Sequence, residues 1–287
     1  MNRNRMTMLR HTTVATILLA LMALSACSGD SPTPGGSTED PLGHVHGVGV
    51  DPGDGTLYVA SHLGVFRVAE NGTRERIANR WQDTMGFAIV GPGHFLGSGH
   101  PDLSEDLPSS LGLIESTDGA KTWESLSLQG DADFHAIEAV GDRIYAYEAR
   151  SGALLVSDDK VTWDTITQQP LYDLAANPAE AHTVYATTDR GVLVVSKDGS
   201  NPVPVVGAPV LTGIDWQPGG PFVGIAPDGT VMLSDDTEAW RPAGQLDGPA
   251  EALDAVVGQW HAATESGVYE STNDGETWRL VLAGDPS

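Results

Sequence analysis

The chain has 287 residues, 40% of them hydrophobic and 19% charged, so it is long enough to bury one large core or two smaller ones. Its 39 Asp and Glu residues outnumber 15 Lys and Arg residues, which gives a formal net charge of -24 at pH 7. A field of that sign repels nucleic-acid phosphates and anionic lipid headgroups, so it excludes general nucleic-acid binding. A single cysteine excludes both an intrachain disulfide and a zinc site built from cysteines.

The first 27 residues have the three regions of a secretory signal. Arginines between positions 3 and 10 precede an apolar run at 14–24 that is too short to span a bilayer. The sequence Leu24-Ser25-Ala26-Cys27 that follows resembles a bacterial lipobox, whose cysteine is lipidated and becomes the mature N-terminus. We therefore predict a signal peptide over 1–26, then a lipidated Cys27 and a flexible Ser/Pro/Gly-rich tether over 27–43. This organisation predicts a monomer anchored to the cell membrane and facing the extracytoplasmic side.

From residue 44 onward the chain repeats one pattern of four short strands about every forty residues, the period typical of propeller blades. Each unit has an apolar strand, a turn, a second strand, a glycine, a third strand, a polar turn and a final strand. The units cover 46–77, 85–128, 134–166, 171–205, 211–243 and 251–281. We predict an all-β domain over 44–287, a six-bladed β-propeller. Seven blades are the alternative, if the region Trp81 to Leu111 contains a further unit.

A short motif recurs at the turn between the third and fourth strands. Its cleanest copy is Ser271–Trp278, with related copies at 116–123 and 157–163 and looser ones at 196–199 and 234–240. The residues that carry it are Ser116, Asp118, Trp123, Ser157, Asp159, Trp163, Ser271, Asn273, Gly275 and Trp278.

These copies resemble the Asp-box (BNR) repeats of sialidase-like and sortilin-like propellers, and the resemblance covers residues 44–283. The chain also resembles bacterial lipoproteins labelled exo-alpha-sialidase or glycosyl hydrolase-like. We interpret the motif as structural. Its Ser and Asp bond the turn backbone, its Gly allows positive φ, and its Trp packs across the hairpin.

Histidines gather at one predicted end of the propeller. The first strand of each blade lines the centre, and its start lies on the same end as the loop between the second and third strands; we call this end the top face. Three neighbouring blades place candidate metal ligands there: His44, His46, His62, Met85, His100 and His135. Imidazole with thioether suits copper and imidazole with carboxylate suits zinc, so we predict a copper or zinc site.

Three carboxylates close in sequence, Asp83, Asp102 and Asp133, are candidate ligands or hydrogen-bond acceptors for that site. The alternative is that the histidines only bond strand ends and loop carbonyls around the channel mouth. The insertion between His100 and Leu111 is expected to be a solvated acidic loop, with a lid over this face as its alternative.

The resemblance to sialidases implies three arginines that hold a substrate carboxylate, a Tyr–Glu nucleophile pair and an Asp acid/base. The Phe-Arg-Ile-Pro motif of that family is absent. The available candidates are Arg80, Arg150 and Arg190 with Glu148. Tyr147 and Glu148 are adjacent on a strand, so their side chains point to opposite faces and cannot easily act together. The sequence therefore favours a non-catalytic module that binds an extracytoplasmic protein or a small ligand, with a sialidase-like glycosidase as the alternative.

Overall fold

The computed structural model describes residues 40–196 and 201–285. These residues contain twenty-four β-strands and one turn of 3-10 helix. They belong to one unit, Glu39–Ser287. The predicted signal peptide, Cys27 and most of the predicted tether lie outside the described residues, as do Asp198 and Gly199 of one loose motif copy. Within the described ranges no helix is long and apolar enough to cross a membrane.

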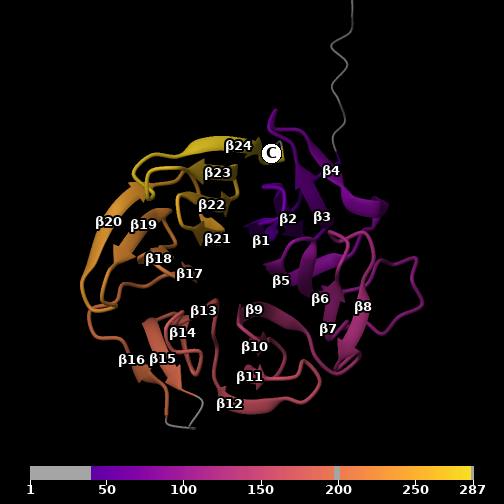
Figure 1. The fold of residues 1–287 in the computed structure, drawn as a ribbon, viewed down its shortest axis with the longest axis horizontal. Helices are drawn as coiled ribbons and strands as arrows, with labels where there is room; N and C mark the ends of the chain where they lie inside the picture. Colours follow the sequence, from indigo (N-terminus) through magenta and orange to yellow (C-terminus); the bar gives the residue numbers. More distant parts are fainter. Residues whose placement is uncertain (1–39, 197–200, 286–287) are drawn as a thin grey trace, which may run out of the picture. The chain divides into compact units, whose positions relative to one another are not determined.

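The strands form six four-stranded antiparallel sheets, each built from consecutive strands and arranged in a ring (Figure 1). The first blade contains β1 (Val45–Val50), β2 (Leu57–Ser61), β3 (Gly64–Val68) and β4 (Arg74–Arg76). The helical turn η1 (Ile77–Asn79) leads to the second blade, with β5 (Asp83–Gly91), β6 (His94–His100), β7 (Leu113–Ser116) and β8 (Glu124–Ser127). The third contains β9 (Phe134–Val140), β10 (Arg143–Glu148), β11 (Ala153–Ser157) and β12 (Asp164–Gln168).

The remaining blades repeat this order. The fourth contains β13 (Leu174–Ala176), β14 (Thr183–Thr188), β15 (Gly191–Ser196) and β16 (Val203–Pro204). The fifth contains β17 (Gly213–Asp215), β18 (Phe222–Ile225), β19 (Thr230–Ser234) and β20 (Trp240–Gln245), and the sixth β21 (Ala250–Val256), β22 (Gln259–Thr264), β23 (Gly267–Ser271) and β24 (Arg279–Ala283). The six-bladed prediction is confirmed, and the region Trp81 to Leu111 contributes strands to the second blade alone.

The hydrophobic core is divided into layers between neighbouring blades. Each cluster of buried apolar side chains takes members from two consecutive blades; for example, Val59 and Phe66 of the first blade pack with Ala263 and Val268 of the sixth. The second strands are buried along almost their whole length, as in β2 and β10. Burial of both sheet faces explains their continuous apolar sequences, because alternation is expected only where one face meets water.

Acidic side chains on the innermost strands link one blade to the next. Each accepts a hydrogen bond from a backbone N–H of the following blade: Ala176 to Glu138 (3.1 Å), Ile214 to Asp173 (2.9 Å) and Ala255 to Asp215 (2.6 Å). Burial raises the pKa of Asp173 to about 7 and also raises the pKa of Glu138 and Asp215. These carboxyl groups therefore hold the inner strands in register at the centre of the ring.

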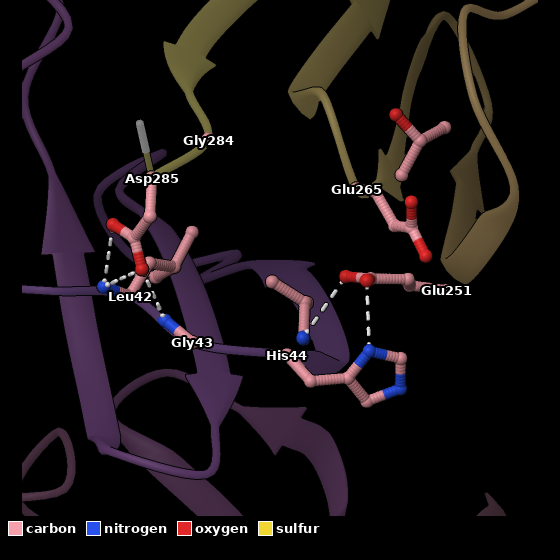
Figure 2. Close-up of a pocket in the computed structure, with 9 residues that line it drawn as sticks. Leu42, Gly43, His44, Glu251, Glu265, Gly284 and Asp285 are labelled. Atoms are coloured by element: carbon pink, nitrogen blue, oxygen red, sulfur yellow. Dashed lines mark hydrogen bonds and ion pairs between the residues drawn. The ribbon is translucent and has the colours of Figure 1, made fainter. Parts of the chain in front are cut away.

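The ring closes where the segment just before β1 meets the Asp285 side chain just after β24 (Figure 2). The Asp285 carboxylate accepts the backbone N–H groups of Leu42 (2.9 Å) and Gly43 (2.8 Å). Arg74 of β4 donates to the same carboxylate (2.6 Å) and to the carbonyls of Ala283 (3.1 Å) and Asp40 (2.7 Å). Leu42 is buried in the core between the first and sixth blades. Leu42 and Gly43, which the sequence analysis places in the tether, are thus part of the propeller.

Candidate metal site on the first three blades

Three ligand atoms from the first two blades converge at the top face. His46 lies on β1, His62 in the turn between β2 and β3, and Asp83 at the start of β5. His62 Nδ1 is 3.3 Å from His46 Nε2 and 3.0 Å from Asp83 Oδ1. All three ligand atoms lie within 4.8 Å of one another. Two imidazoles and one carboxylate form a set of the kind that binds zinc or a similar divalent ion.

The two contacts of His62 Nδ1 compete for one hydrogen. His62 Nδ1 cannot donate to Asp83 and also accept from His46, so hydrogen bonding satisfies the arrangement only if one N–H is shared between the Asp83 carboxylate and the His46 lone pair. Burial, followed by the neighbouring rings of His62 and His44, lowers the pKa of His46 to about 3. His46 is therefore neutral at pH 7, which is the form of imidazole that binds a metal.

His44 stands beside the pair and is held by an acid of the last blade. Its Nδ1 is 2.7 Å from Glu251 Oε1, and the other oxygen of Glu251 accepts the Val45 N–H at 3.0 Å (Figure 2). That hydrogen bond to Glu251 raises the pKa of His44. The His44 ring centroid lies 4.9 Å from that of His46 and 5.7 Å from that of His62. Glu251 thus orients His44 and leaves Nε2 as the ring's remaining ligand atom, a role that the sequence analysis missed.

His100 and His135 meet at a different acid. Asp133 Oδ2 lies 3.1 Å from His135 Nε2 and 3.7 Å from His100 Nε2. His100 Nδ1 donates to the carbonyl of Ser109, at 2.6 Å, in the insertion of the second blade. The same insertion is held to the first blade by the ion pair of Arg80 with Glu105. The insertion therefore packs beside the top face and orients one of the histidines.

Asp102 and Met85, the two other candidates for the site, take part in local backbone structure. Asp102 accepts the backbone N–H groups of Trp81 and Ser104, both at 2.8 Å, and so stabilises the start of the insertion. Met85 lies in a β-bulge of β5, where the pairing with β6 shifts between Thr84 and Gly86. Because a bulge interrupts the alternation of side chains, the strand pattern used in the sequence analysis does not fix the direction of Met85.

Each residue considered for sialidase-like chemistry lies beside a residue of opposite charge. Arg80 pairs with Glu105, and Arg150 lies 3.2 Å from Glu148. Arg190, whose side chain is 91% exposed, lies 3.5 Å from Asp189. Glu148 also accepts hydrogen bonds from the backbone N–H groups of Asp133 (3.3 Å) and Ser151 (2.7 Å). The geometry therefore favours structural roles for these groups.

The motif residues form similar turns at the outer edges of several blades. Ser116 Oγ accepts the Ala120 N–H at 2.9 Å, and Asp118 accepts both the N–H (2.9 Å) and the hydroxyl (2.7 Å) of Thr122. The equivalent bonds recur at Ser271, Asn273 and Thr277, and in part at Ser157, Asp159 and Thr162. These turns are stabilised by side chain to backbone bonds, as the sequence analysis proposes.

The motif tryptophans differ from the expectation that they pack across their own hairpins. Trp163 Nε1 of the third blade donates to Ser127 of the second at 3.0 Å, and its ring lies 5.1 Å from that of Phe134. Trp278 joins the core layer between the fifth and sixth blades, and Trp123 the layer between the first and second. The tryptophans therefore pack between blades, because each core layer is shared by two sheets.

Comparison with known proteins supports the fold. No family model and no curated protein matches the chain. A chain of a nidogen–laminin complex superposes with a TM-score of 0.59 at 10% identity, over 76% of this chain and 89% of that one. Virginiamycin B lyase from Staphylococcus aureus gives 0.53 at 10% identity, over 83% and 84%. An ancestral GH74 enzyme gives 0.51 at 18% identity, over 85% of this chain but only 39% of the enzyme. At these identities the likenesses show that the chain shares the propeller fold with these proteins.

Proposed function

We propose that this protein is a membrane-anchored, extracytoplasmic binding module that holds a zinc or copper ion through His46, His62 and Asp83. The observation that carries the proposal is the convergence of two imidazole nitrogens and one carboxylate oxygen within 4.8 Å. Three protein ligands leave a coordination position for a further group, so the bound ion is accessible to a ligand or partner. The proposal is supported by His46, which is neutral at physiological pH and needs no deprotonation to bind.

A binding role also agrees with what similar propellers do. One of them was solved within a complex of nidogen with laminin, and we extend partner binding of this general kind to the present chain. Arg80, Arg150 and Glu148, which a sialidase-like site would need, are held in local ion pairs, and Arg190 is 91% exposed beside its neighbour Asp189. We therefore propose a small ligand or an extracytoplasmic protein as the partner, and no glycosidase reaction.

Removing one of the three ligands is expected to abolish tight metal binding. The full chain, solubilised in detergent, is titrated with zinc and with copper in a calorimeter, and bound metal is measured by elemental analysis. His46→Ala is expected to weaken binding at this position by about 100-fold, because one of three protein ligands is lost. His94→Ala is the matched control. His94 lies at the end of β6 opposite His100, and its Nε2 lies 2.8 Å from Glu115 Oε1. Equal affinity of His46→Ala and the parent chain contradicts the proposal.

The anchor is tested separately through Cys27. Cells that make the full chain are grown with a labelled fatty acid, and the purified protein is examined for covalent label. Cys27→Ser is expected to remove the label completely, because lipid attachment at a lipobox begins at the cysteine thiol. Ser28→Ala, a change at the adjacent residue, is expected to retain it. Label on the Cys27→Ser protein would show that the lipid is attached elsewhere.

A further inference from the structure

A second group of metal ligands lies at the boundary of the second and third blades. His100 ends β6, Asp133 directly precedes β9, and His135 is the second residue of β9. Asp133 Oδ2 lies between the two rings, 3.1 Å from His135 Nε2 and 3.7 Å from His100 Nε2. Among the described residues, His46, His62 and Asp83 are the group whose ligand atoms all lie within 4.8 Å of one another, so a shared ion at Asp133 requires the rings of His100 and His135 to turn closer together.

The tautomer of His100 is fixed by the loop beside it. Its Nδ1 lies 2.6 Å from the carbonyl oxygen of Ser109, which can only accept a hydrogen bond, so Nδ1 carries a proton. In the neutral ring Nε2 then carries a lone pair, and this lone pair faces the Asp133 carboxylate across 3.7 Å. That distance is too long for a hydrogen bond. The contact becomes favourable in either of two ways: Nε2 takes up a proton and forms an ion pair with Asp133, or a metal cation lies between the lone pair and the carboxylate.

The Asp133 carboxylate is itself incompletely satisfied. The residue is only 6% exposed, and its second oxygen, Oδ1, is buried without a hydrogen-bond partner. An unpaired buried carboxylate oxygen destabilises the folded chain, so such a group calls for a partner. A cation bound by both carboxylate oxygens would satisfy Oδ1 and Oδ2 together. The same cation would also be a partner for the lone pair of neutral His100.

We propose that a second divalent metal ion binds to His100, Asp133 and His135. Two imidazoles and a carboxylate again form a zinc-type ligand set, and the Ser109 carbonyl supplies the outer hydrogen bond that orients a metal-binding histidine. His46 of the first group lies within electrostatic range of both His135 and Asp133. The top face of the first three blades therefore holds two neighbouring ions rather than one, each on its own ligand set.

The test is the number of zinc ions bound by the full chain, measured by calorimetry with zinc alone and by elemental analysis. The parent chain is expected to bind two equivalents. Asp133→Asn and His100→Ala are each expected to bind one, as is His62→Ala of the first group, and the double variant His62→Ala/Asp133→Asn is expected to bind none. His100 has a side chain that is 43% exposed, so its variant reports on binding even if Asp133→Asn folds poorly.

The variants separate this proposal from the proposed function. One equivalent in the parent that survives Asp133→Asn and His100→Ala, and is lost in His62→Ala, overturns the second position and leaves the first intact. One equivalent that survives His62→Ala and is lost in Asp133→Asn and His100→Ala supports the second position and overturns the first. His94→Ala again serves as the control, since His94 lies at the end of β6 opposite His100 and pairs with Glu115 of β7.

Discussion

Replacing Gly99 by alanine is expected to destabilise the protein by at least about 3 kcal/mol and to weaken metal binding at His46, His62 and Asp83. Gly99 has φ +131°, and a Cβ at this position would lie 2.1 Å from the carbonyl oxygen of Asp83 and 2.8 Å from the Met85 nitrogen. Both atoms are backbone, so β5 must move away from β6. Backbone strain of this kind costs about 1–3 kcal/mol before any displacement of neighbours is included.

The measurement is thermal unfolding together with zinc titration. For a domain of this size a loss of about 3 kcal/mol lowers Tm by roughly 6–12 °C. Gly141→Ala is the matched control: it also has positive φ, +61°, but a Cβ there meets nothing within 4 Å. The control is expected to lose only about 1 kcal/mol and to bind zinc like the parent chain. If both variants lose the same stability, the close approach of Gly99 to Asp83 has no energetic effect.

Asp285→Ala is expected to open the seam between the first and last blades and to cost about 3 kcal/mol. The carboxylate accepts two backbone N–H groups and the guanidinium of Arg74. Hydrogen bonds to a buried charged group contribute about 1.5–3 kcal/mol each, and their sum is reduced here because the Asp285 side chain is 31% exposed. Its loss leaves Arg74, whose side chain is only 6% exposed, without its acidic partner. Unfolding in urea is expected to show a lower midpoint with an unchanged slope.

Glu276→Gln provides the comparison for removal of a negative charge near the C-terminal end, since Glu276 is exposed in its turn. Its free energy of unfolding is expected to stay within about 0.5 kcal/mol of the parent value. Asp285→Asn should fall between the two, because the amide keeps one acceptor oxygen but loses the charge. A midpoint for Asp285→Ala equal to that of Glu276→Gln would show that the ring is closed by core packing alone.

The fold could be predicted because every blade is a continuous segment with all four strands in sequence order. One repeat therefore corresponds to one sheet, and counting repeats counts blades. The acidic links between inner strands were not predicted, although their signal was present: Glu138, Asp173, Asp215 and Asp254 each interrupt an apolar stretch at the start of a unit. An acid in such a position is half-buried or buried at the ring centre, and for Glu138, Asp173 and Asp215 the next blade supplies a backbone N–H donor.

The site was harder to predict than the fold. Strand order places His46, His62, His100 and His135 on one face, but it does not determine which acid each ring meets. His44 pairs with Glu251, 207 residues away, and this contact exists only because the ring closes. The division of the histidines between Asp83 and Asp133 depends on side-chain geometry and on the bulge at Met85, neither of which follows from hydrophobic alternation.

Because side chains close the ring, the chain could begin and end at any junction between two blades without dividing a sheet. Because no sheet in the described residues shares strands from both ends, a circularly permuted chain that begins at another junction would still contain six whole blades. In such a permutant the former ends would be joined covalently where Leu42 and Gly43 now meet Asp285. The present order has a different effect during synthesis. The blades that carry His46, His62, His100 and His135 emerge first, and Asp285, which holds the first blade in place, emerges only after all six blades.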